Sequence, residues 1–82
     1  MKEKIKQYIV EEIIEDPGFN LNYDDKIIEE SIIDSTEIVK IILFLEDTYD
    51  VKIENDEIKL KNFNSVDDIC NFIKRKVDGN EE

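Results

Sequence analysis

The sequence predicts an all-α protein: a small four-helix bundle of three main helices and one short helix, with a long loop between the first and second helices. Three segments repeat apolar residues at spacings of three and four over 11 or more positions, which is typical of amphipathic helices. The alternation typical of a strand lasts only four residues. With 82 residues, 40% of them apolar, the chain has the length and composition of a single domain, residues 1–82, with one core.

The first helix is predicted over residues 2 to about 15, and a long loop follows it. Its inner stripe consists of Ile5, Tyr8, Ile9, Val10 and Ile13. The helix is expected to end at Asp16-Pro17-Gly18, because proline lacks a backbone donor and glycine tolerates a left-handed turn. Loops beyond about 12 to 15 residues are uncommon in compact domains. We therefore expect four apolar side chains to hold the loop on the core: Phe19, Leu21, Ile27 and Ile28.

The second helix is predicted from about Asp34 to about Tyr49. Asp34 and Glu37 have the spacing of a capping box, in which two side chains satisfy unpaired backbone N–H groups at a helix start. The predicted inner stripe is Val39, Ile42, Leu45 and Tyr49. This phase puts Leu43 on the outside of the helix.

The segment between the second and the last helix is predicted to be mostly irregular. Val51–Glu54 alternates like a strand, but no hairpin partner is present, which favours a short connection. Residues 55–60 could form one helical turn, and residues 62–64 are typical of a loop. The 20 Ile and Val residues would also suit a small β-sandwich, but the helical periodicity of three long segments argues against it.

The last helix is predicted to begin with a second capping box, formed by Ser65 and Asp68, and to end at Gly79 before a short tail. Its predicted inner stripe is Val66, Ile69, Cys70, Ile73 and Val77. A cysteine on this stripe behaves as a small apolar residue, and as the only cysteine it cannot form an internal disulfide.

The charge balance narrows the classes of partner. The chain has 22 Asp and Glu against 11 Lys and Arg, a net charge of −11, which repels nucleic acid and anionic membranes and favours a basic partner protein. Histidine, the commonest general base and a common metal ligand, is absent, so neither a hydrolytic triad of the usual type nor a zinc site is expected. The charged N-terminal segment is unlike a signal peptide or a membrane span, which predicts a cytoplasmic protein. One small core needs all the apolar stripes, which predicts a monomer.

Ser35 is the candidate site residue that the sequence singles out. It lies in the first turn of the predicted second helix, where unpaired N–H groups and the positive end of the helix dipole favour a phosphate group. No base or oxyanion clamp accompanies it in the sequence. Ser35 is therefore a better candidate for a modified residue than for a catalytic nucleophile.

Residues 33–53 resemble the second helix and following loop of acyl carrier proteins and related peptidyl carrier domains. That family has an Asp-Ser step, here Asp34-Ser35, followed by a hydrophobic helix, a Leu-Glu pair, an aromatic residue and a short apolar alternation. Residues 27–33 resemble the loop before the serine, and residues 62–73 resemble the entry into the family's last helix. The resemblance covers residues 27–77.

The resemblance implies a non-catalytic carrier with a four-helix fold. In the family, a phosphopantetheinyl transferase attaches 4′-phosphopantetheine from coenzyme A to the serine, and the thiol of this arm holds an acyl group as a thioester in fatty acid or polyketide biosynthesis. By that resemblance Ser35 is the attachment site, a ligase loads the arm, and downstream synthases with basic patches dock on the second helix. The implied docking residues are Asp34, Thr36, Glu37, Leu43, Glu46 and Asp47.

Two alternatives remain open beside the acyl carrier. One is a stand-alone aminoacyl or peptidyl carrier loaded by an adenylating ligase, and the other is an unmodified acidic protein that blocks a basic surface. The chain departs from the family at Thr36, where leucine is common, at Ser31, where glycine is frequent, and at Lys40, on a face that is often acidic throughout. These departures bear on the identity of the partners and not on attachment at Ser35.

Overall fold

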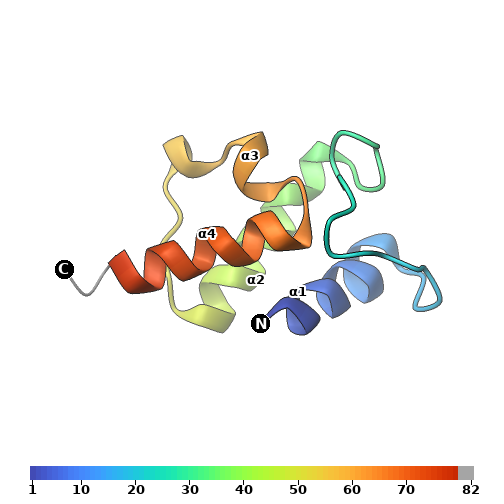
Figure 1. Ribbon diagram of the computed structural model, residues 1–82, viewed down its shortest axis with the longest axis horizontal. Helices are drawn as coiled ribbons and strands as arrows, with labels where there is room; N and C mark the ends of the chain where they lie inside the picture. Colours follow the sequence, from blue (N-terminus) through green and yellow to red (C-terminus); the bar gives the residue numbers. More distant parts are fainter. Residues whose placement is uncertain (80–82) are drawn as a thin grey trace.

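The computed structural model describes residues 1–79, and over this range the chain is the predicted helical bundle, without strands (Figure 1). In chain order the elements are α1 (Lys2–Tyr8), the π-helical segment η1 (Ile9–Ile14), the 3₁₀ turn η2 (Ser35–Glu37), α2 (Ile38–Tyr49), the 3₁₀ turn η3 (Asn55–Glu57), α3 (Leu60–Phe63) and α4 (Val66–Gly79). Figure 1 shows α4 lying across α2, with the short α3 beside the first half of α4. The predicted tail, residues 80–82, lies outside the described residues.

α1 and η1 together form the predicted first helix, but its end differs from the expectation. The buried residues are Ile5, Ile9, Val10 and Ile13, and Tyr8 is half-buried beside them. The left-handed residue at the end is Glu15, with φ of 62°, and not Gly18. The N–H groups of Glu15 and Asp16 both donate to the Val10 carbonyl oxygen. The helix therefore ends at Glu15, before Pro17.

The long loop is held on the core by three of its four predicted anchors. Leu21 and Ile27 are fully buried, and Ile28 is half-buried. The prediction for Phe19 is wrong, because this side chain is 36% exposed and lines a shallow surface depression over α1. Backbone hydrogen bonds complete the attachment, since the Tyr23 carbonyl oxygen accepts from the N–H of Asp67 at 3.0 Å.

α2 begins with the predicted capping box. The Thr36 N–H donates to Asp34 Oδ1 at 3.1 Å, and the Asp34 N–H donates to Glu37 Oε1 at 3.0 Å. The first turn is the 3₁₀ turn η2, and the α-helical turns run from Ile38 to Tyr49, the predicted end.

The predicted inner face of α2 is partly wrong. The buried residues are Ile38, Ile41 and Leu45, whereas Val39 is 60% exposed. Ile42 and Tyr49 are half-buried at the edge of this face. Most of α2 is apolar, so its periodicity allows more than one phase, and contact with the other helices selects one. Tyr8 marks one such contact, because its ring stacks on Phe44 with the ring centroids 4.2 Å apart.

The connection from α2 to α4 is more ordered than predicted. Val51 and Ile53 are buried in an irregular segment, and the expected helical turn is present as η3. The prediction of a loop at residues 62–64 is wrong for its first two residues, since Asn62 and Phe63 lie in α3. The buried Asn62 is accommodated in this helix because its Nδ2 donates to the Glu57 carbonyl oxygen at 2.8 Å.

α4 begins as predicted, with the Asp68 N–H donating to Ser65 Oγ at 3.0 Å. Its buried residues include the expected Val66, Ile69, Cys70 and Ile73. Val77 is exposed, contrary to the prediction, because the end of α4 extends past the other helices (Figure 1). Phe72, which lies off the predicted inner stripe, is buried against Phe63 at a centroid distance of 5.4 Å. None of the helices in residues 1–79 has the length and apolar character needed to span a membrane.

Glu57 makes the stability of η3 dependent on pH. Its carboxylate accepts from the Glu54 N–H and from Lys76 Nζ, both at 2.8 Å, and these bonds lower its pKa from the ordinary value of 4.5. A carboxylate with a lowered folded pKa stabilises the fold above its unfolded pKa, and this contribution is lost as the pH falls through the folded value.

We therefore expect the difference in unfolding free energy between wild type and Glu57→Gln to be largest near neutral pH and to shrink below about pH 4.5. Urea unfolding of both proteins over a pH series measures this difference. A difference that stays constant down to about pH 3 would contradict the assignment.

Candidate functional site

Ser35 is exposed at the start of η2, directly after the N-cap residue Asp34. The two side-chain hydrogen bonds at this helix start join Asp34 with Thr36 and with Glu37, and neither uses the Ser35 hydroxyl. The cap therefore holds the backbone of Ser35 in place while leaving the hydroxyl accessible.

Two surface depressions meet at Ser35. The first has a volume of about 500 Å³ and is lined by the loop before α2, at Ile28, Ser31, Ile33 and Asp34. The second is an apolar groove of about 240 Å³ between the start of α2 and the segment that enters α3. Its lining residues are Ile28, Ser35, Ile38, Ile58, Lys59, Leu60 and Phe63. Ser35 thus lines an apolar groove that also includes two exposed apolar side chains, Ile58 and Leu60.

The predicted docking residues lie along α2 and its capping turn, but they are not equally accessible. Asp34, Thr36, Leu43 and Asp47 are exposed. Glu37 and Glu46 are half-buried and bound to the backbone: Glu37 completes the capping box, and Glu46 Oε2 accepts from the Ile53 N–H at 2.9 Å. Glu46 therefore anchors the segment after α2, a role that the sequence analysis missed.

One exposed stripe on α2 begins at Ser35. Residues four apart on a helix are neighbours on its surface, and Ser35, Val39, Leu43 and Asp47 follow this spacing. Val39 and Leu43 are 60% and 61% exposed, so the stripe is apolar in the middle and acidic at its far end. The sequence analysis missed Val39 because the predicted phase placed this residue inside.

Asn64 positions the loop that leads to Ser35, and sequence reasoning missed it too. This buried side chain accepts from the N–H groups of Ile28 and Glu29 at 3.3 and 3.1 Å, and its Nδ2 donates to Glu29 Oε1 at 2.6 Å. The backbone carbonyl oxygen of Asn64 accepts from the Ile27 N–H at 2.8 Å. One residue at the junction of α3 and α4 therefore holds three consecutive residues of the loop.

We expect Asn64→Ala to lower the free energy of unfolding by about 1 to 3 kcal/mol, because partly buried N–H groups lose their acceptor. Hydrogen exchange of the Ile28 and Glu29 amides should accelerate more than exchange in α4. The matched control is Asn71→Ala on the exposed face of α4, with an expected change within about 0.5 kcal/mol. Equal urea midpoints for the two variants would show that Asn64 does not hold the loop.

Ser31, four residues before Ser35, has φ of 57°. This left-handed conformation is unfavourable for residues with a side chain and is readily adopted by glycine. Glycine is frequent at the position of Ser31 in the family that the sequence resembles, and the backbone conformation of Ser31 is one that glycine adopts easily.

The described residues include no group of three His, Cys, Asp or Glu side chains that could hold a metal ion. Comparisons of the chain with protein-family models, with curated proteins and with solved structures found no match.

Proposed function

We propose that this protein is an acyl carrier protein whose Ser35 holds a 4′-phosphopantetheine arm. The observation that carries the proposal is the placement of Ser35: an exposed residue, whose hydroxyl is unused by the helix cap, in the lining of an apolar groove. The arm would carry an acyl group as a thioester, and partner enzymes, not this chain, would perform the chemistry. The resemblance over residues 27–77 and the left-handed backbone at Ser31 support the same proposal.

The helix start suits a phosphodiester on Ser35. Such a group is anionic, and the positive end of a helix dipole stabilises an anion. Asp34 Oδ1 and Glu37 Oε1 each accept a backbone N–H, and neither carboxylate is hydrogen-bonded to the Ser35 hydroxyl. The base for the transfer reaction would therefore come from the phosphopantetheinyl transferase.

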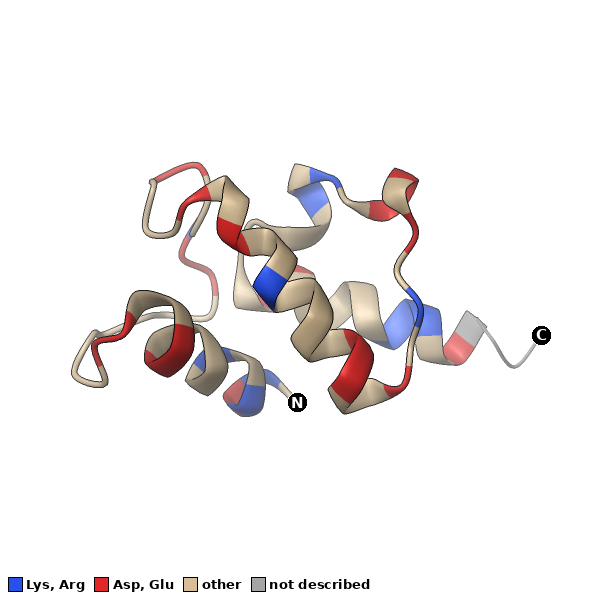
Figure 2. Cartoon of the chain, turned by 180° about the vertical axis from the view of Figure 1, so that it is seen from behind, with Lys and Arg blue, Asp and Glu red and all other residues tan. Residues whose placement is uncertain are grey.

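The docking surface in this proposal is the exposed stripe of α2 with the acidic residues beside it. Val39 and Leu43 would contact an apolar patch of the partner, and Asp34 and Asp47 would face basic residues around that patch. Figure 2 shows α2 mostly tan, with Asp and Glu at its far end and in the loop before it, and these carboxylates support a basic partner. We propose further that the protein is monomeric and cytoplasmic.

The test is incubation of the purified protein with coenzyme A and a phosphopantetheinyl transferase of broad specificity, followed by intact-mass measurement. We expect a mass increase of one phosphopantetheine group per chain. An unchanged mass under conditions that load a known carrier would overturn the proposal and favour an unmodified acidic binding protein.

The loaded protein then distinguishes the two kinds of carrier. Acyl-ligases with fatty acids and adenylating ligases with amino acids are offered in parallel, and thioester formation is followed by mass. Acylation supports the acyl carrier, whereas selective aminoacylation would replace it with the aminoacyl or peptidyl carrier.

A further inference from the structure

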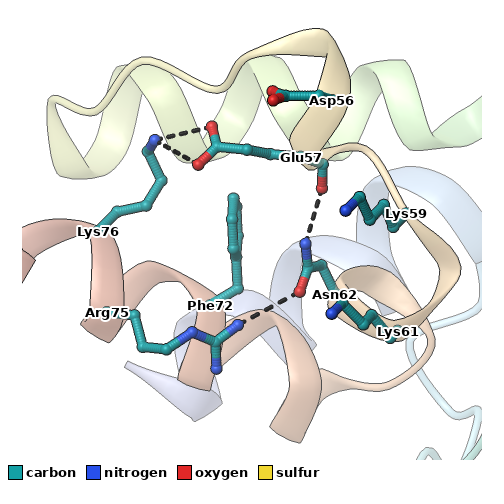
Figure 3. A pocket seen from close by; sticks show the side chains of 8 residues that line it. All are labelled: Asp56, Glu57, Lys59, Lys61, Asn62, Phe72, Arg75 and Lys76. Atoms are coloured by element: carbon teal, nitrogen blue, oxygen red, sulfur yellow. Dashed lines mark hydrogen bonds and ion pairs between the residues drawn. The ribbon is translucent and has the colours of Figure 1, made fainter.

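A further pocket, away from the stripe on α2, lies between η3, α3 and the last turns of α4 (Figure 3). Its volume is about 440 Å³, within the range of about 300 to 1,000 Å³ that is usual for small-molecule sites. The lining residues are Asp56, Glu57, Lys59, Lys61, Asn62, Phe72, Arg75 and Lys76.

The pocket is basic in a chain that is strongly acidic. Four of its eight lining residues are Lys or Arg, compared with 11 of 82 in the whole chain. Figure 2 shows the blue of Lys and Arg on α3 and on the last turns of α4, the two walls of this pocket. A cluster of cations with this density attracts an anion locally, although the net charge of the molecule is −11.

Hydrogen bonds hold one cation in a defined position. Arg75 Nη2 donates to Asn62 Oδ1 at 3.3 Å, and Asn62 is itself buried and fixed by its bond to the Glu57 carbonyl oxygen. Figure 3 shows this chain of bonds crossing the pocket from Arg75 to η3. This bond ties the exposed Arg75 side chain to the wall of the pocket.

The acidic residues of the pocket do not neutralise the cluster. Glu57 is paired with Lys76, whose Nζ lies 2.8 and 3.0 Å from its two carboxylate oxygens. Apart from this pair, the lining has three cationic side chains and one carboxylate: Lys59, Lys61, Arg75 and Asp56. The remaining charge of the lining is positive.

We propose that this pocket binds a small phosphate-bearing anion, held by Lys59, Lys61 and Arg75. A guanidinium presents parallel N–H donors that match the oxygens of a phosphate, and the two ammonium groups add charge without fixed geometry. The volume exceeds that of a single phosphate group, so the fitting ligand class is a pyrophosphate or a phosphate ester with an organic part. Lys59 also lines the groove at Ser35, whereas Lys61 and Arg75 do not, so these two residues distinguish this inference from the carrier proposal.

The test is a titration of the ¹⁵N-labelled protein with inorganic pyrophosphate at low salt, followed by amide chemical shifts. We expect the largest shifts at Lys61, Asn62 and Arg75, and a weaker affinity on addition of salt. Arg75→Gln should raise the Kd about tenfold, the effect of one lost charge-assisted hydrogen bond. Lys61→Gln is the second variant, and neither residue lines the groove at Ser35.

The matched control is Lys40→Gln, which makes the same change in net charge on the exposed surface of α2. Its Kd should change less than twofold or so, because long-range attraction alone is weak. If Lys40→Gln and Arg75→Gln lowered the affinity for pyrophosphate equally, the binding would be nonspecific electrostatic attraction, and the proposed site would be wrong. Equal or tighter binding of citrate or of a poly-glutamate peptide would overturn the assignment to phosphate.

Discussion

Ser35→Ala is expected to abolish phosphopantetheine loading while leaving the fold intact. The substitution removes the oxygen to which the arm would be attached. The Ser35 hydroxyl takes no part in the capping box, and the side chain is exposed, so its loss should change the free energy of unfolding by no more than about 0.5 kcal/mol. Intact mass after incubation with the transferase and circular dichroism measure the two parts of this prediction.

Thr36→Ala is the matched control, since it removes a neighbouring exposed hydroxyl from the same turn. The Thr36 backbone N–H, which donates to Asp34, is retained in this variant. It should reach the full mass increase at the end point, even if partner contacts alter the rate. Full loading of Ser35→Ala would place the modification on another residue, and loss of loading in both variants would point to a disturbed helix start.

Leu45→Ala is expected to cost about 2 to 5 kcal/mol of the free energy of unfolding, as large-to-small changes in a well-packed core do. Leu45 is fully buried on the inner face of α2, in the core shared with α1 and α4. The free energy of unfolding of a native protein is commonly about 5 to 15 kcal/mol, so this single change would remove a large share of it. Urea unfolding followed by circular dichroism measures the loss.

Leu43→Ala provides the control on the same helix. Leu43 is 61% exposed, so its truncation removes few packing contacts, and a change within about 0.5 kcal/mol is expected. By the proposed function, Leu43→Ala should instead weaken partner binding, because this side chain lies in the middle of the exposed stripe. Similar urea midpoints for the two variants would contradict the observed phase of α2.

The helix boundaries of this protein were largely predictable because local interactions set them. The capping box predicted at Asp34 and Glu37 is present at the start of α2, and at the start of α4 Ser65 Oγ accepts the Asp68 N–H, which is one of the two bonds of the predicted box. The end of the first helix was less predictable. It depends on the wide turn of η1 and on two N–H groups that share the Val10 carbonyl oxygen.

Asn64 and Glu46 show why part of the candidate site could not be read from the sequence. Asn64 holds residues that are 35 and 36 positions away, and Glu46 binds the backbone seven residues later. No periodicity or local motif encodes such contacts. Polar residues of this kind look like ordinary loop or surface residues until the chain is folded.

By itself the sequence determined the helical class, the two capped helix starts and the position of Ser35 in a first turn, because periodicity and capping act between near neighbours. Only the tertiary structure decided which side of α2 faces outward. That helix is apolar on several sides, and packing into the common core buries Ile38, Ile41 and Leu45 while leaving Val39 exposed. The groove at Ser35 and the basic pocket beside α3 were decided in the same way, since each joins residues that are distant along the chain.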